Sequence, residues 1–279
     1  MRKCKNFVLE EPMTLELNKL LSGEMDIDEY IMWVNTPFPV YTVHLMRALL
    51  DLKNRGLKVL PVEPYLQIVE GIHEAVEANR YDEYVKNEVV QKVLKVEREA
   101  TGALIEYHEA FMSRDFDSVV EATLKFAKAD AKRFVLRDKM RADKIAEINE
   151  NCLVEAGQIH FLLEEELKNR AEVSNVDSVN IVEKVANTLG IDYVKNPGNE
   201  LTEIYIKEII GEEFNGDVEL LAAQALIYIT LVSKEEMVPE EGQFPHLLDE
   251  VKCAKIARSM SYDNCRKFMN RVWFGRSKN

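Results

Sequence analysis

The sequence predicts a predominantly helical α/β fold with a small, mostly parallel sheet, a large helical insertion and a helical C-terminal part. Its 279 residues are 47% hydrophobic and 30% charged, which is enough apolar surface to bury a substantial core. Three short apolar runs are bounded by glycine, proline or acids, as buried strands are, and most of the other segments have helical periodicity. Helices between such strands are typical of a parallel sheet.

The first strand is expected at Phe7–Leu9. This apolar run is closed by Glu10, Glu11 and Pro12, and a proline cannot donate to a sheet ladder. The two glutamates are therefore expected at the carboxyl end of the strand.

Helical segments follow this strand. Thr14 is a suitable N-cap for a helix over residues 15–21 that ends at Gly23, and Asp26 is a suitable N-cap for the next helix. A third, amphipathic helix is expected to begin after Pro39.

The second strand is expected at Leu57–Val62, between Gly56 and Pro64. It ends in Glu63, much as the first strand ends in Glu10. In parallel sheets, ligands gather at the carboxyl ends of strands, so the position of these acids indicates a site.

Residues 65–148 have an almost wholly helical pattern, with breaks expected near Tyr81, Thr101 and Asp115. This insertion is expected to form a lid or a helical subdomain. The third strand follows at Leu153–Ala156, before a glycine turn and a helix rich in Leu and Glu.

Further helices are expected after Arg170, over residues 180–189, 201–210, 218–232, 246–260 and 261–273. The predicted division is an α/β core over residues 1–170, which contains the insertion, and a helical part over residues 171–279 packed on it.

Composition excludes several classes of protein. The four cysteines make no Cys-x-x-Cys pair, so neither a disulfide framework nor a structural zinc site is expected. The longest nearly apolar run, residues 218–232, is shorter than the roughly 18 residues that span a bilayer. No stretch near the first residue resembles a signal peptide. A cytoplasmic protein with no membrane partner is expected.

The net charge of -13 argues against a nucleic-acid partner, which binds through its phosphates. The charge is unevenly distributed, because residues 251–279 carry eight basic residues and a single acid, Asp263. This basic segment is expected either to dock on the acidic remainder of the chain or to bind an external anion or partner.

His160 is the leading candidate for chemistry. It lies three residues after Gly157, at the expected carboxyl edge of the sheet, where a histidine can ligate a metal or exchange protons near neutral pH. Glu10 or Glu11, together with Glu63, are candidate metal ligands or general bases. The alternative roles are an exposed or helix-capping histidine, and acids that pair with helix dipoles.

Arg133, Arg137 and Arg141 are spaced at i, i+4 and i+8 on the helix before the third strand. Such a ridge can hold a carboxylate or phosphate through its guanidinium groups. The alternative is a solvated face paired with acids.

Glu70 and His73 have the Glu-x-x-His spacing of carboxylate-bridged di-metal helix bundles. A bundle site needs a second such pair, and the glutamates beside His108 do not have the required spacing. A helical di-metal oxidoreductase is therefore not favoured.

Four stretches taken together resemble the superfamily of Tiki, TraB, erythromycin esterase and the haem-uptake protein ChaN: VLEEP, VLPVEPY, RFVLRDKMRADKIAEI and LVEAGQIHFLLEEEL. In that superfamily a helix with Arg-Asp or Arg-Asn and a Met precedes a strand that ends in Gly-x-x-His. The matching residues are Arg137, Asp138 and Met140 on the helix and Gly157 and His160 in the turn.

The superfamily also has an acid at the end of the strand that corresponds to Phe7–Leu9, so Glu10 or Glu11 takes that role. Members usually carry an earlier strand with a Gly-Glu-x-His or Gly-x-x-His motif, which this sequence does not show. The resemblance then implies a site rebuilt with Glu63 and the C-terminal helices, or a loss of catalysis.

The resemblance implies a metal-dependent hydrolase of a small acyl or peptide substrate. A divalent metal such as Mn²⁺ would be held by His160, Glu10 and Glu63 and would activate water. His160, Glu10, Glu11 and Arg137 would be catalytic, with Arg137 orienting a substrate carboxylate or the developing oxyanion.

Arg133, Arg141 and Glu63 would then bind substrate. The alternative is a non-catalytic, small-molecule-binding or regulatory protein that needs no cofactor. A homo-oligomer is left open in both cases.

Overall fold

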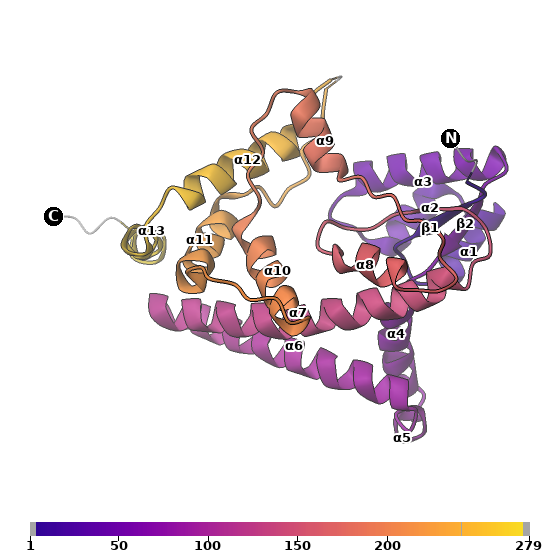
Figure 1. Cartoon of the computed structure of the whole chain (residues 1–279), viewed down its shortest axis with the longest axis horizontal. Coiled ribbons are helices and arrows are strands. Elements are labelled where there is room, and N and C mark those ends of the chain that lie inside the picture. Colours follow the sequence, from indigo (N-terminus) through magenta and orange to yellow (C-terminus); the bar gives the residue numbers. More distant parts are fainter. Residues whose placement is uncertain (1–3, 241, 276–279) are drawn as a thin grey trace. The chain divides into compact units, whose positions relative to one another are not determined.

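The computed structural model describes residues 4–240 and 242–275, and Figure 1 shows its helices and strands. In chain order the elements are β1 (Asn6–Leu9), α1 (Leu15–Ser22), α2 (Ile27–Val34), α3 (Pro39–Asn54), β2 (Lys58–Pro61), α4 (Pro64–Glu77), α5 (Tyr81–Tyr84), α6 (Glu88–Ser113), α7 (Phe116–Ala146), β3 (Cys152–Val154), α8 (Leu162–Lys168), α9 (Ile181–Thr188), α10 (Pro197–Ile209), α11 (Val218–Leu231), α12 (Pro245–Arg258) and α13 (Tyr262–Phe274). The predicted, predominantly helical α/β fold is confirmed.

The sheet has three parallel strands in the order β2-β1-β3. In its register Asn6 pairs with Lys58 on one side and with Cys152 on the other. All three predicted strands are present within two residues of their expected limits. Since the strands are parallel, their carboxyl ends meet at one edge of the sheet.

Local sequence explains where several elements begin and end. Thr14 caps α1 by accepting a hydrogen bond from the Leu17 N–H at 3.1 Å. Asp26 caps α2 in a reciprocal capping box with Glu29. Gly56 has a φ of 95°, which suits glycine and turns the chain from α3 into β2.

The prediction of a break near Thr101 was wrong, because α6 runs unbroken through Thr101 and Gly102. A glycine inside a helix costs only about 1 kcal/mol relative to alanine, and α6 buries Val93 and Ala100. The expected breaks near Tyr81 and Asp115 are present.

Two compact units share the described residues. Unit 1 contains the residues up to Val93, Leu136–Ser178 and Glu235–Val238. Unit 2 contains Leu94–Val135, Val179–Lys234 and the residues from Pro239 on. This division differs from the predicted one, because the middle of the insertion, residues 94–135, belongs with the helical C-terminal part.

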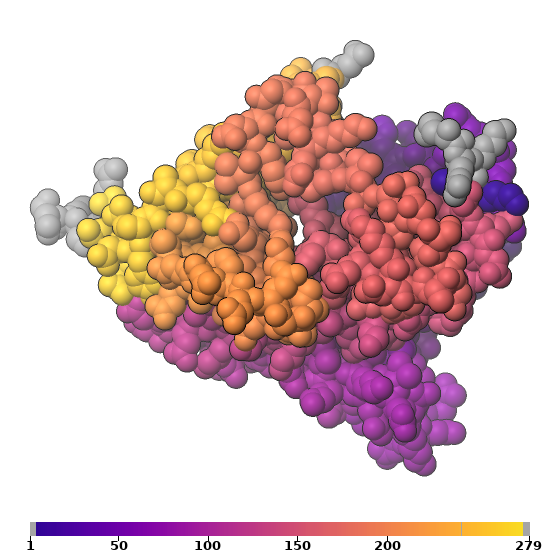
Figure 2. All heavy atoms as spheres, in the orientation of Figure 1, coloured from indigo at the N-terminus to yellow at the C-terminus, as the bar shows by residue number. Residues whose placement is uncertain are grey.

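Successive residues of β1 pack into different apolar clusters of unit 1, as the two-residue period of a strand requires. Leu9 joins the cluster formed with α1, α2 and α3, whereas Val8 packs with Ala142 of α7 and Leu163 of α8. In Figure 2, α8 and the chain that follows it cover part of the face of unit 1 that is turned toward the viewer. Because Glu10 lies two residues after Val8, its side chain is directed toward the same side of the sheet, on which α7 lies.

Unit 2 is built around α11, which is buried at every position from Leu221 to Tyr228. The helix has apolar residues on all sides, as a central helix needs, and the amide of its buried Gln224 donates to the Arg258 and Met260 carbonyls. Even so, no helix in the described part of the chain is long and apolar enough to cross a membrane.

The basic C-terminal segment pairs with acids of the same unit. Lys255 lies 3.0 Å from Asp192, and Arg266 lies 2.7 Å from Asp117. These contacts agree with docking on an acidic part of the chain, the first of the two expected roles. Arg276 and Lys278 lie outside the described residues.

Candidate functional site

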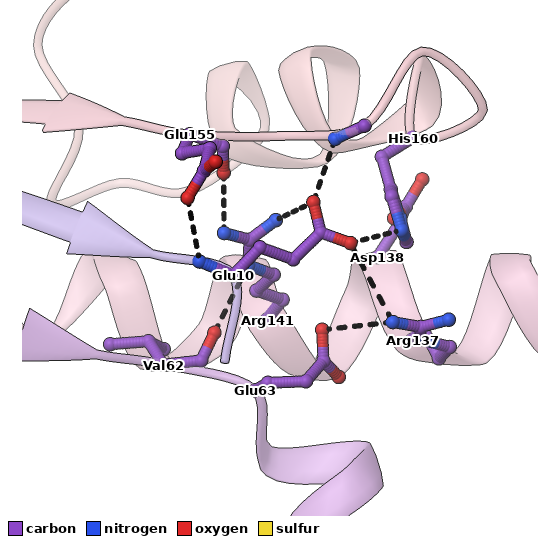
Figure 3. Close-up of polar contacts among 9 residues, drawn as sticks. Glu10, Val62, Glu63, Arg137, Asp138, Arg141, Glu155 and His160 are labelled. Carbon is purple, nitrogen blue, oxygen red and sulfur yellow. Dashed lines mark hydrogen bonds and ion pairs between the residues drawn. The ribbon is translucent and has the colours of Figure 1, made fainter. Parts of the chain in front are cut away.

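The carboxyl ends of the three strands converge as expected, and each of them is followed by an acid (Figure 3). Glu10 directly follows β1, Glu155 directly follows β3, and Glu63 lies two residues after β2. The ladder continues beyond the strands, because the Val62 N–H donates to the Leu9 carbonyl at 3.0 Å and the Glu155 N–H to the Val8 carbonyl at 2.9 Å.

Three residues of α7 face the same edge, and His160 reaches it from the turn after β3. We call the charged group at this edge the edge cluster, which consists of Glu10, Glu63, Arg137, Asp138, Arg141 and His160. All of its members belong to unit 1.

His160 is buried between two carboxylates. Its Nδ1 contacts Oδ1 of Asp138, and its Nε2 lies 2.8 Å from Oε1 of Glu10. Burial alone would lower the pKa of His160, but the hydrogen bonds and charges of Asp138 and Glu10 outweigh burial and raise it to about 9. The ring is therefore a doubly protonated imidazolium near neutral pH.

Glu10 has partners at both carboxylate oxygens. Oε2 accepts a hydrogen bond from the Gly157 N–H at 2.7 Å and lies 3.3 Å from the Arg141 guanidinium. Burial would raise the pKa of Glu10, but His160, Arg141 and the Gly157 N–H lower it to about 2. The Glu10 carboxylate is therefore ionised across the physiological range.

The three arginines of the expected ridge do not all lie at the site. Nη2 of Arg137 lies 3.2 Å from Oε2 of Glu63 and 3.6 Å from Oε1 of Glu10. Arg133 instead belongs to unit 2, where its guanidinium pairs with Asp130 at 2.5 Å and with Glu97 at 3.5 Å. The structure thus does not bring Arg133 to the predicted substrate site.

Two of the three residues predicted to bind substrate are also sealed from solvent. The side chains of Arg141 and Glu63 are both 0% exposed. Neither residue is placed to meet a substrate directly in this arrangement. Arg137, with 13% of its side chain exposed, is the arginine of the edge cluster that reaches solvent.

Glu11 lies at the exposed rim of the edge. Neighbouring protein atoms partly desolvate its carboxyl group, and this desolvation, with the negative charges of Glu155, Glu10 and Glu63, raises the pKa of Glu11 to about 7. A carboxyl group with this pKa can accept and return a proton near neutral pH.

Sequence reasoning missed two residues of the site. Asp138 matches the family motif in the sequence, but only the structure shows that its buried carboxylate holds His160. Burial raises the pKa of Asp138, and the charges of His160 and Arg141 oppose that effect. Glu155, whose pKa burial also raises, follows β3 as Glu10 follows β1, so the same strand-end rule would have found it.

A divalent metal does not fit the donors as they are arranged. Both ring nitrogens of His160 and both oxygens of Glu10 already have partners, and the guanidinium groups of Arg137 and Arg141 would repel a cation beside Glu10. Within residues 4–240 and 242–275, no group of three or more His, Cys, Asp or Glu side chains is placed to hold a metal ion. The predicted ligand set of His160, Glu10 and Glu63 instead forms ion pairs.

The sequence of this chain is similar to that of a protein of Archaeoglobus fulgidus. No known family model matches the sequence, and no solved structure matches the chain. An uncharacterized protein of Archaeoglobus fulgidus is 36% identical over 267 residues, which covers 95% of this chain and 89% of that protein. At this identity and coverage, the chain belongs to the same protein family as the Archaeoglobus fulgidus protein.

Proposed function

We propose that this protein is a hydrolase that acts on a small acyl or peptide substrate at the carboxyl edge of its sheet. The observation that carries this proposal is the exposed Glu11 carboxyl group, with a pKa of about 7, beside a buried and already ordered cluster of charges. The resemblance to the Tiki, TraB, erythromycin esterase and ChaN superfamily supports the same class of reaction. Metal dependence is not part of the proposal, because the donors do not fit a cation.

Glu11 is the general base. Its ionised carboxylate accepts a proton from water as the water oxygen forms a bond to the acyl carbon, and the carbonyl electron pair moves onto the oxygen. The bond from the acyl carbon to the leaving oxygen or nitrogen then breaks. Protonated Glu11 returns its proton to the leaving group, so the products are an acid and an alcohol or amine.

Arg137 stabilises the oxyanion. Glu63 and Glu10 fix its guanidinium group, and the 13% of its side chain that is exposed is available to a substrate. A fixed cation at the point where negative charge develops lowers the barrier without reorganisation.

His160 supports this arrangement without exchanging protons. With a pKa of about 9 and a carboxylate at each nitrogen, it is not a general base at neutral pH. It holds Glu10, which in turn holds Arg137.

The test is hydrolysis of p-nitrophenyl acetate and butyrate and of N-acetyl dipeptides between pH 5 and pH 9. We expect a rate that rises with pH through an apparent pKa near 7. Glu11→Gln should lower kcat by about 10²-fold or more, because that is the usual contribution of a general base. Glu24→Gln, which changes an exposed acid at the end of α1, is the matched control and should leave the rate unchanged. A wild-type protein that hydrolyses none of these substrates, or a Glu11→Gln variant with full activity, contradicts the proposal.

A second candidate is a non-catalytic binding or regulatory protein. It is favoured by the charge balance of the edge cluster, in which three acids face three basic groups and both nitrogens of His160 are occupied. In that case N-acetyl amino acids would raise the melting temperature of the wild-type protein through Arg137 without being hydrolysed.

A further inference from the structure

Arg141 makes contacts to the ends of all three strands (Figure 3). Its Nε donates to the Val62 carbonyl, after β2, at 3.0 Å, and its Nη2 donates to the Glu155 carbonyl, after β3. Its Nη1 lies 3.3 Å from Oε2 of Glu10, after β1. One guanidinium group thus joins the central strand to both of its neighbours.

These contacts fix the acids of the site. Both hydrogen bonds are partly buried, and a carbonyl that is removed from water without a donor is costly, so each carbonyl is held to the guanidinium group. The Val62 carbonyl immediately precedes Glu63, and the Glu155 carbonyl belongs to the same residue as a rim carboxyl group. The Arg141 side chain is 0% exposed and contacts protein groups on each of these sides, so a substrate does not reach it.

We propose that Arg141 is a positioning residue that holds Glu10, Glu63 and Glu155 in register at the edge, rather than the substrate-binding residue that its spacing with Arg137 indicates. This inference rests on the proposed hydrolytic function for its kinetic consequence only. Its geometric consequence, a rigid strand edge, holds whether or not the site is catalytic.

Lysine cannot replace Arg141 in this role. The planar guanidinium group donates in several fixed directions at once, whereas an ammonium group is a compact charge on a flexible stem. Arg141→Lys therefore keeps the positive charge beside Glu10 and loses the simultaneous contacts to both edge strands. Since positional errors of about 1 Å can cost about 100-fold in rate, the loss should appear in kcat.

The kinetic arm compares Arg141→Lys with Lys139→Arg, a conservative change at an exposed position of the same helix. We expect Arg141→Lys to lower kcat by about 100-fold with KM unchanged, and Lys139→Arg to match the wild type. A rise in KM with kcat unchanged would mean that Arg141 binds substrate and would overturn the proposal.

The second arm does not depend on activity. Hydrogen exchange of the Val62, Glu155 and Gly157 amides should be at least 10-fold faster in Arg141→Lys than in the wild type and in Lys139→Arg. Equal exchange in all three proteins would overturn the positioning role. A wild type without hydrolytic activity, but with this exchange pattern, would remove the proposed function and leave the positioning role supported.

A measurement on the wild type keeps the proposal testable if Arg141→Lys does not fold. The Nε–H of Arg141 should give a separate, slowly exchanging resonance in a nitrogen-15 NMR spectrum, because the side chain is 0% exposed and its Nε–H donates to the Val62 carbonyl. Exchange as fast as that of the exposed Arg55 side chain would overturn the proposal.

Discussion

The innermost residues of the edge cluster in unit 1 and of the core around α11 in unit 2 are equally buried but are held together in different ways. The side chains of Asp138 and Arg141 are 0% exposed, as are Ala222 and Ile227 of α11. The core of unit 2 gains free energy from the apolar surface that it removes from water. The edge cluster must first lose the hydration of six charged groups, and their mutual attraction offsets that cost only because the pairs are well formed.

This contrast indicates where selection for function acts. A buried ion-pair cluster is often no more stable than apolar residues of the same volume, so stability alone does not explain why unit 1 keeps one. Groups with strongly shifted pKa values are common at functional sites, and His160, Glu10 and Glu11 all have them. The apolar core around α11, by comparison, is accounted for by packing.

The largest effect is expected from Asp138→Ala, which removes a buried ion pair from the edge cluster. The change removes the Asp138 carboxylate from the buried imidazolium of His160, and removing one partner of a buried pair costs about 3–5 kcal/mol. Trp33 lies in unit 1 and Trp273 lies in unit 2. In a Trp273→Phe background, the fluorescence of Trp33 during urea unfolding therefore measures the stability of unit 1.

The control for this change is Asp51→Ala, which removes an exposed ion pair with Arg55 on α3. That pair should contribute less than about 1 kcal/mol. If Asp138→Ala costs no more than this control, the edge cluster is not coupled to the fold of unit 1.

A pH titration should separate the two units. The raised pKa of His160 gives stability that is complete below its ordinary pKa of 6.5 and is lost as the pH rises through about 9. The lowered pKa of Glu10 gives stability that is complete above 4.5 and is lost as the pH falls through about 2. With Glu11 replaced by Gln, these two groups should make unit 1 most stable between about pH 4.5 and pH 6.5.

Raising the pH from 6 to 10 should cost unit 1 about 3 kcal/mol through His160. Glu11→Gln is the suitable background, because ionisation of Glu11, with its raised pKa, also destabilises unit 1 as the pH rises through 7. Unit 2 serves as the internal reference through Trp273. An equal loss in both units would show that the edge cluster is not the source.

Ile227→Ala tests how much apolar packing in the core around α11 contributes to the stability of unit 2. Ile227 is 0% exposed in the core around α11, and truncation of such a residue costs at least about 2 kcal/mol. Because no charge is involved, the loss should be the same at pH 6 and pH 10. Unfolding in a Trp33→Phe background measures it, and a pH-dependent loss would mean that unit 2 is not held by packing alone.

The sequence contains enough information for the backbone of the site. Short apolar runs that end at proline or glycine predict the strands, and parallel pairing then brings Glu10, Glu63 and His160 to one edge. These inferences depend on local periodicity and on one general property of parallel sheets, so they survive without knowledge of tertiary contacts.

The partners of the arginines, unlike the strands, do not follow from local periodicity in the sequence. Arg133 and Arg141 have the same helical spacing from Arg137, yet they are about 12 Å apart along α7, at a rise of about 1.5 Å per residue. Only three-dimensional packing determines which turn of this long helix passes under the sheet edge. The same limit explains why Asp138 was matched to a motif without its partner, His160, being recognised.

Glu236 is the clearest contact that no local pattern predicts, and it gives the smallest of the expected effects. Its carboxylate accepts hydrogen bonds from the Val40 N–H at 3.0 Å and the Tyr41 N–H at 2.7 Å, at the start of α3. Phe38, the N-cap residue, supplies no side-chain hydrogen bond. Glu236, almost 200 residues further along the chain, thus acts as the missing cap of a helix in unit 1.

Glu236→Ala should therefore lower the unfolding free energy of unit 1 by about 1 kcal/mol and leave that of unit 2 unchanged. The matched control is Glu240→Ala, an exposed acid four residues later whose carboxylate bonds only to a nearby exposed glutamine, Gln243, in the contacts described. Fluorescence unfolding in the two single-tryptophan backgrounds measures both units. Equal losses in the two variants would mean that the bonds to α3 contribute nothing, whereas a loss confined to unit 1 shows that this remote acid completes the helix beside the charged edge.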